Sequence, residues 1–175
     1  MEQSAGKVET SGEPQGNARV LWISTMAFSL GFAIWGMFSA LAPFLIEWYH
    51  FTSTQVLVLA AMEPLFAAAI SIPLGIWTDK FGGRTVFTIL LVLLSVVLIL
   101  GTFAEGYYSF LFLGSMLGLG GATFVVGNAH VSSWYPKSKQ GTALGLFALG
   151  NIGITFGMMA VTFVITSVAD QSDPE

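Results

Sequence analysis

The stretch GIWTDKFGGR, Gly75 to Arg84, is short and polar and separates two long apolar runs. It holds one acid, Asp79, and two bases, Lys80 and Arg84, whereas the two flanking runs contain a single acid between them. Apolar runs of about 20 residues are long enough to cross a bilayer as helices. We therefore predict that this stretch is a hinge between two membrane-spanning helices.

The composition agrees with a membrane protein. Hydrophobic residues make up 54% of the chain and charged residues 9%, whereas a soluble domain carries about 25% charged residues. The mean hydropathy is +0.76. Five stretches are long enough to span a hydrocarbon core of about 30 Å, so we predict an all-α polytopic membrane protein with a helical bundle over residues 19–168. The predicted spans are approximately 20–46, 55–77, 85–103, 108–128 and 142–168.

The two ends of the chain are expected to lie outside this bundle. Residues 1–18 contain too few apolar side chains to order themselves and are predicted to form a disordered tail. Residues 169–175 are predicted to form a second polar tail. Because there is no Cys, neither a disulfide framework nor a thiolate metal site is expected.

The basic residues predict the orientation. With five helices, every Lys and Arg falls on one side of the membrane, and the opposite connections contain none. The positive-inside rule then places the N-terminus in the cytoplasm. The six bases are Lys7, Arg19, Lys80, Arg84, Lys137 and Lys139.

Glu63 is the one ionisable residue well inside a predicted span. A carboxylate at that depth is costly unless it is paired, protonated or facing water, so it is a candidate for the substrate path. The alternative is an acid near the outer interface, followed by Pro64, that reaches headgroup water or stays protonated. Both interpretations remain open at this point.

Glycines recur through the fourth and fifth predicted helices at spacings that allow helices to pack closely. Asn151 lies among them and can both donate and accept hydrogen bonds. It could hold a polar substrate or make an interhelical hydrogen bond. The glycines predicted to mediate packing are Gly114, Gly118, Gly145, Gly150, Gly153 and Gly157.

The sequence offers no arrangement of residues that points to enzyme chemistry. The two histidines are eighty residues apart, and no nucleophile elbow or dinucleotide-binding motif is present. We therefore expect no catalytic residues, metal site or cofactor. No basic patch for nucleic acid is found either.

Three motifs indicate a family. Gly75, Asp79, Lys80, Gly82 and Arg84 resemble the signature between helices 2 and 3 of the major facilitator superfamily. Three longer stretches resemble the nitrate/nitrite porter branch of that family, and the likeness covers nearly the whole chain after residue 20. They are IPLGIWTDKFGGR (72–84), GLGGATFVVGN (118–128) and SSWYPKSKQGTALGLFALGNIG (132–153).

This resemblance implies a bacterial inner-membrane transporter, or one of a membrane derived from it. Such transporters have twelve helices in two pseudo-symmetric halves and work by alternating access. It also implies that Asp79 and Arg84 act in a cytoplasmic gate. Of the family's anion site, Asn151 matches the polar group of helix 5, Phe124 matches the aromatic residue of helix 4, and Ser71 occupies the position of the helix 2 arginine.

Two departures from the family pattern affect the expected function. No base lies in any predicted span, and the buried acid Glu63 favours a cation or a proton over an anion. The branch also has relatives associated with magnetosome membranes and iron, which makes a cation transporter an alternative to a nitrate/nitrite porter.

The second departure is length, because the chain covers five of the six helices that form one half of such a transporter. We therefore expect it to be incomplete on its own. Its expected partners are the lipid bilayer, a small inorganic ion, and the missing transporter half or another membrane subunit. A fragment, a truncated product, a split transporter and a membrane scaffold subunit that does not transport all remain open.

Overall fold

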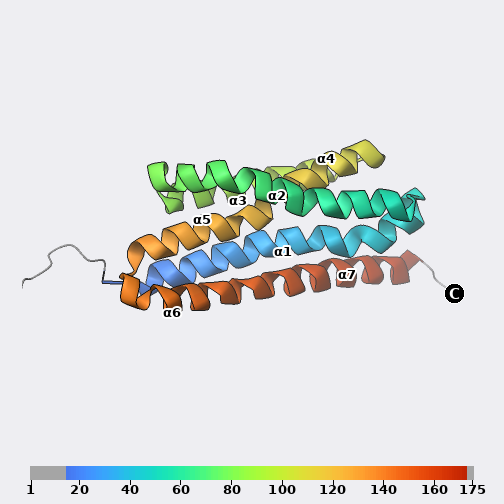
Figure 1. The fold of residues 1–175 in the computed structure, drawn as a ribbon. Helices are drawn as coiled ribbons and strands as arrows, with labels where there is room; N and C mark the ends of the chain where they lie inside the picture. Colours follow the sequence, from blue (N-terminus) through green and yellow to red (C-terminus); the bar gives the residue numbers. More distant parts are fainter. Residues whose placement is uncertain (1–14, 173–175) are drawn as a thin grey trace, which may run out of the picture.

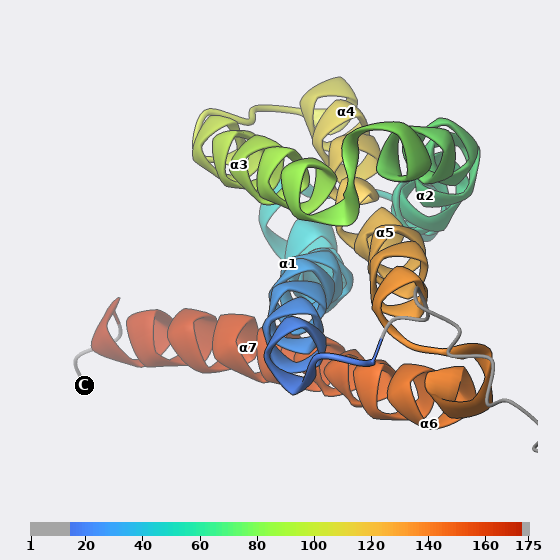
Figure 2. The same ribbon diagram turned by 90° about the vertical axis from the view of Figure 1, so that its left-hand side faces the viewer.

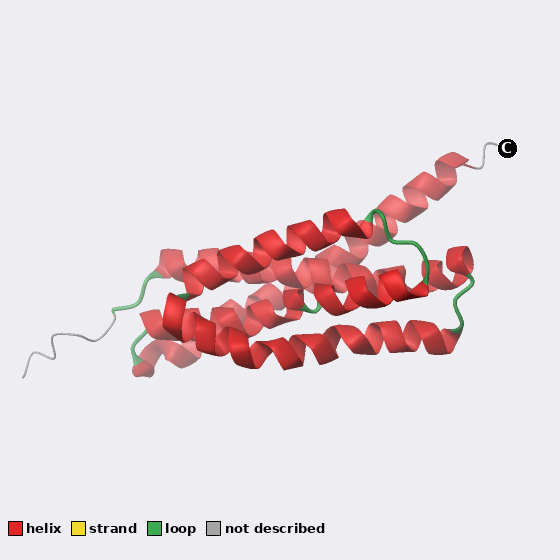
Figure 3. Ribbon diagram, turned by 90° about the horizontal axis from the view of Figure 1, so that it is seen from above, coloured by secondary structure: helices red, strands yellow, loops and turns green. Residues whose placement is uncertain are grey.

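The computed structural model describes residues 15–172, and every regular element in that range is a helix (Figure 3). Most of the predicted N-terminal tail, residues 1–14, lies outside the described residues, as do residues 173–175. In chain order the elements are α1 (Ala18–Tyr49), α2 (Ser53–Phe81), α3 (Gly83–Gly101), α4 (Tyr107–Leu117), α5 (Leu119–Trp134), α6 (Lys137–Phe147), the 3-10 helix η1 (Ala148–Asn151) and α7 (Ile152–Ser172).

Five segments of the described chain are long and apolar enough to cross a membrane, which confirms the predicted all-α polytopic architecture. The segments α1, α2 and α3 are single spans. The helices α4 and α5 together form the fourth span, and α6, η1 and α7 form the fifth. The chain is therefore a multi-pass membrane protein.

The helices extend further than the apolar runs that predicted them. The fourth span continues to Trp134 instead of 128, and the fifth begins at Lys137 instead of 142. The helix α7 also continues to Ser172, into the predicted polar tail. Hydropathy marks only the part of a helix that lies in hydrocarbon, whereas backbone hydrogen bonding continues into the headgroup region.

The prediction of a polar hinge over Gly75–Arg84 was wrong in its extent. Residues 75–81 form the last two turns of α2, and α3 begins at Gly83. Only Gly82 lies outside both helices, with φ 82° and ψ 141°. A single glycine reverses the chain because it adopts a backbone conformation that is closed to residues with a Cβ.

The helix α1 runs through the middle of the bundle. It packs mainly against α7 and α5, and α5 also packs against α2. Figure 2, which looks along the helices, shows α2, α3 and α4 on one side of this centre and α6 and α7 on the other. Figure 1 shows the helices passing back and forth along the length of the bundle, and Figure 2 shows that α6 and α7 cross the others at an angle.

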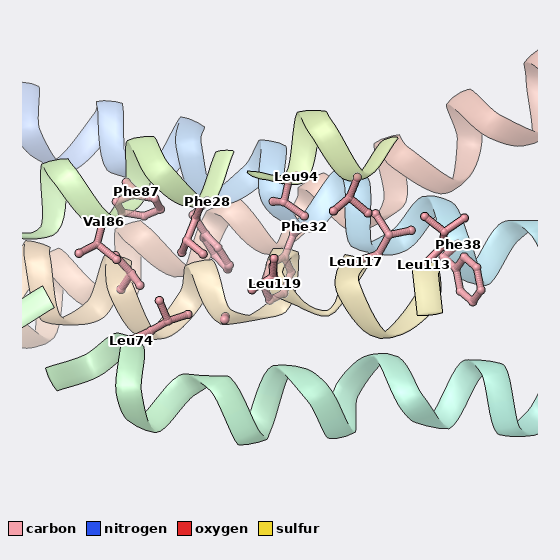
Figure 4. Packing of buried hydrophobic residues seen from close by; sticks show 14 of the residues in the cluster. Phe28, Phe32, Phe38, Leu74, Val86, Phe87, Leu94, Leu113, Leu117 and Leu119 are labelled. Atoms are coloured by element: carbon pink, nitrogen blue, oxygen red, sulfur yellow. The ribbon is translucent and has the colours of Figure 1, made fainter. Parts of the chain in front are cut away.

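Aromatic and aliphatic side chains fill the space between the helices (Figure 4). Phe28 of α1 is fully buried, with its ring centroid 4.3 Å from that of Phe32 and 4.7 Å from that of Phe147. Leu94 of α3 and Val126 of α5 are also fully buried. The core therefore joins α1, α3, α5 and α6.

Close backbone contacts occur where glycines face a neighbouring helix. A Cβ at Gly153 would meet the carbonyl oxygen of Ser29, and one at Gly157 would meet that of Ala33, so α7 lies directly against the backbone of α1. Gly118 lies in the same way against the carbonyl oxygen of Glu63.

The other glycines predicted to pack differ in their surroundings. A Cβ at Gly114 would lie 2.8 Å from the Phe38 ring, and one at Gly150 would meet the Phe28 ring. Gly145 has no other atom within 4 Å of its Cβ position in the described chain, so a packing role for Gly145 stays a prediction.

Candidate functional site

The polar residues between α2 and α3 lie on the surface at one end of the bundle. Asp79, Lys80 and Arg84 are all exposed. The Lys80 ammonium lies 5.4 Å from the centroid of the Phe81 ring. The turn around Gly82 therefore presents an acid and two bases outward, where a second protein segment could reach them. The gate role of Asp79 and Arg84 stays a prediction.

Glu63 lies inside the bundle. It is 2% exposed and belongs to the same buried stripe of α2 as Leu59 and Ala67. This stripe faces the junction of α4 and α5, where Gly118 lies against the Glu63 backbone. Among the described residues the Glu63 carboxyl oxygen Oε1 has no hydrogen-bond partner.

Phe124 and Asn151 are each close to Phe147, Phe124 through its ring and Asn151 by following it along the chain. The Phe124 ring is 39% exposed, and its centroid lies 5.4 Å from that of Phe28 and 6.2 Å from that of Phe147. Asn151 closes η1, one turn after Phe147, and is exposed. Its amide nitrogen Nδ2 donates to the carbonyl oxygen of Ala148 at 2.8 Å.

Ser71 is partly buried on α2, and its hydroxyl donates to the carbonyl oxygen of Ala67 at 2.6 Å. This hydrogen bond within α2 occupies the Ser71 proton and leaves oxygen lone pairs for an incoming donor. Gly75, one turn further along α2, lies near Val125 of α5.

These candidates form two groups. Phe124 belongs to the aromatic cluster of Phe28 and Phe147, and Asn151 follows Phe147 by one turn, whereas Glu63 lies beside Gly118. The six residues from Gly118 to Phe124 correspond to about 9 Å along a helix. Along α5, the point of contact with Glu63 is therefore separated from Phe124 by roughly two helical turns.

Sequence analysis did not single out Trp35 as a polar site. Its indole nitrogen Nε1 is buried and, like Glu63 Oε1, has no hydrogen-bond partner within residues 15–172. The Trp35 ring packs beside Gly121, close to Ala67. A tryptophan in an apolar helix normally indicates packing or an interfacial position, so the sequence carried no signal for a buried polar atom here.

Metal-ligating side chains do not gather in the part of the chain that the structure describes. No group of three or more His, Asp or Glu residues lies close enough there to hold a metal ion. Glu63 is thus an isolated carboxyl rather than a member of a cluster.

The family profile and the individual relatives that match this chain agree on one family. The profile of the Major Facilitator Superfamily matches residues 21–169. A probable nitrate/nitrite antiporter of Thermus thermophilus is 36% identical over 150 residues, which are 86% of this chain and 34% of that protein. A nitrate/nitrite transporter of Escherichia coli is 32% identical over 155 residues, which are 84% of this chain and 33% of the relative.

A third relative, a nitrite extrusion protein of Bacillus subtilis, is 28% identical over 158 residues, which are 89% of this chain and 40% of that protein. The chain thus spans about a third of the length of these curated relatives. The family profile covers all five spans except the first three residues of the first. With this match and five membrane-spanning helices, the chain belongs to the Major Facilitator Superfamily.

Proposed function

We propose that this chain is a portion of a secondary transporter that moves nitrate or nitrite by alternating access. The names of its relatives support this substrate class. The single structural observation that carries the proposal is the exposed Asn151 amide, which follows Phe147 by one turn, since the Phe147 ring centroid lies 6.2 Å from that of Phe124. This amide is a polar group on an otherwise apolar part of the bundle.

The Asn151 amide has the chemistry that a small planar anion needs. Its NH₂ group has two N–H donors, and one of them is used by the carbonyl oxygen of Ala148. The second N–H can donate to an oxygen of nitrate or nitrite. Phe124, whose ring lies near that of Phe147, provides a flat apolar wall, and Ser71 contributes a hydroxyl on α2.

In the described chain every Lys and Arg lies near the end of a helix, so the middle of the spans supplies no positive charge for the anion. Burying an anion without a compensating charge or strong donors is costly, and Ser71 stands where the family's helix 2 arginine is expected. We propose that a further protein segment supplies this charge, either a second transporter half or another membrane subunit. The exposed Asp79, Lys80 and Arg84 would contact the same segment as a gate.

A cation, such as ferrous iron, is the second candidate substrate. The buried carboxyl of Glu63 supports it, because an intramembrane acid attracts cations and is a functional candidate by default. Against it, the described residues contain no group of three or more His, Asp or Glu side chains that could hold a metal ion. Nitrate or nitrite is therefore the first candidate.

An uptake assay distinguishes the two substrates. The chain would be expressed in a bacterial strain that lacks nitrate transporters, together with the remaining two thirds of the Thermus relative as a separate polypeptide. Nitrate, nitrite and ferrous iron uptake would be measured with the pair and with that relative portion alone.

Two variants give the assay its controls. Asn151→Asp replaces donors by a carboxylate and should abolish nitrate and nitrite uptake, while Glu63→Gln should leave it unchanged. Iron uptake that is lost in Glu63→Gln would instead establish the cation. No uptake of any ion by a pair that assembles in the membrane would favour a scaffold subunit.

A further inference from the structure

A cavity of about 590 Å³ opens at the end of the bundle where α1 and α3 begin and α5 ends. Figure 2 shows these three helices from that end. Gly83, at the start of α3, lies directly against the His130 imidazole, so α3 is held on α5 beside the cavity. The polar residues that line it are Arg19, Ser24, Arg84, Thr88, His130 and Trp134.

The mouth of this cavity is positively charged. Arg19 and Arg84 each lie in the first turn of a helix, where the helix dipole already adds a positive partial charge. Neither first turn contains an acid. No Asp or Glu belongs to the cavity lining among the described residues. Two bases at two helix N-termini without a carboxylate are a favourable place for an anion.

Behind the mouth, the cavity becomes apolar. On α1 the lining runs from Arg19 through Ile23 to Ala27, and on α3 it runs from Arg84 to Leu91. These distances correspond to about 12 Å and 10 Å along a helix. A free inorganic anion would use only the mouth, whereas a molecule with a charged head and a hydrocarbon tail would fill both parts.

We propose that this cavity binds an anionic phospholipid. The phosphate lies between the Arg19 and Arg84 guanidinium groups, which can each donate two hydrogen bonds to it. The first carbons of an acyl chain follow Ile23, Ala27 and Leu91 toward the membrane interior. Basic pockets between transmembrane helices are a known setting for acidic headgroups. This lipid site shares Arg84 with the proposed gate, but it does not depend on which ion the transporter moves.

Native mass spectrometry of the full chain in mild detergent tests the proposal. The fraction of protein that retains dioleoyl phosphatidylglycerol would be compared with the fraction that retains dioleoyl phosphatidylcholine. We expect a preference for phosphatidylglycerol. The R19Q/R84Q double variant should lower phosphatidylglycerol retention roughly 10- to 30-fold and leave phosphatidylcholine retention unchanged.

The matched control is K137Q/K139Q, which removes two bases from α6, outside the cavity lining. It should change retention by less than about threefold, since charge near the surface acts mainly within a Debye length. Equal losses in the two double variants would show a general charge effect and overturn the site. Equal retention of the two lipids by the unmodified chain would also overturn it.

A third variant separates a lipid from a free anion. Ile23→Trp keeps both arginines and fills the apolar part of the cavity, so it should lower phosphatidylglycerol retention. If the R19Q/R84Q variant loses its helical circular dichroism signal and so has not folded, the Ile23→Trp variant tests the proposal in its place. If Ile23→Trp has no effect and excess inorganic phosphate displaces the lipid completely, the cavity is a site for a free anion and the lipid proposal fails.

Discussion

Gly153 shows how little space separates α7 from α1. Its Cβ position is occupied by the carbonyl oxygen of Ser29, an atom of the neighbouring backbone that cannot move aside as a flexible side chain can. The close contact between α7 and α1, and not an unusual backbone conformation, therefore requires a glycine at position 153. The same holds for Gly157 against Ala33 one turn later.

We expect Gly153→Ala to destabilise the bundle. The added methyl group must push α7 away from α1, which should lower the free energy of unfolding by about 1–3 kcal/mol. Gly145→Ala is the matched control, because nothing in the described chain lies within 4 Å of that position. It should be neutral or stabilising by up to about 1 kcal/mol. Thermal unfolding in detergent measures both, and equal shifts would contradict the close contact.

Glu63 illustrates the opposite situation, a polar group where packing alone would favour an apolar one. An unpartnered buried polar atom costs about 1–3 kcal/mol, so Glu63→Leu should raise the thermal unfolding temperature. Glu63→Gln keeps a buried polar group and should not raise it. If Glu63→Leu instead lowers the unfolding temperature as a core truncation does, the carboxyl has a stabilising partner and the interpretation fails.

At the scale of elements, the reversal between α2 and α3 depends on Gly82. Its φ of 82° combined with ψ of 141° belongs to a region that residues with a Cβ rarely occupy. No atom lies within 4 Å of its Cβ position, so nothing but the backbone requires a glycine there.

Gly82→Ala should therefore lower the free energy of unfolding by about 1–3 kcal/mol through strain alone. Gly141→Ala serves as its control, since Gly141 also faces open space but lies inside α6 with ordinary helical geometry. The difference between the unfolding temperatures of the two variants measures the cost of the strained backbone conformation at position 82. Identical temperatures would mean that α2 and α3 relax to another turn.

The number of membrane spans and their helical type could be predicted from the sequence, because runs of about 20 apolar residues in a membrane allow helices and little else. Helix ends were less predictable. Asp79 and Lys80 are polar and suggested a loop, yet they continue α2 because headgroup water can solvate them within a helix. The hydropathy pattern did not indicate the irregular turns at Gly118 and at Ala148–Asn151.

The candidate site was predictable in part. Asn151 and Phe124 were predicted through motifs; the structure places the Phe124 ring against those of Phe28 and Phe147, and the roles of both residues stay predictions. That Glu63 faces the inside of the bundle depends on the rotation of α2 about its axis, which a single acid in an apolar run does not reveal. Trp35 and the cavity at Arg19 arise from contacts between distant segments.

For the molecule as a whole, the bases gather at one end. Arg19, Arg84, Lys137 and Lys139 lie at the starts of α1, α3 and α6, and Lys80 lies at the end of α2. An up-and-down passage of five spans brings all these helix ends to the same side. The opposite connections within residues 15–172 carry no Lys or Arg, so the positive-inside rule predicts that the basic end faces the cytoplasm.

Cysteine labelling can test this orientation directly, because the chain contains no Cys. Glu105→Cys places a thiol between α3 and α4, and Ser138→Cys places one at the start of α6, and both positions are exposed. A membrane-impermeant maleimide should label Glu105→Cys in intact cells and Ser138→Cys only after the cells are permeabilised. The reverse pattern would place the basic end outside and invert the proposed gate. Labelling of both positions in intact cells would mean that the chain does not keep one orientation, since a fixed five-span topology puts these two connections on opposite sides of the membrane.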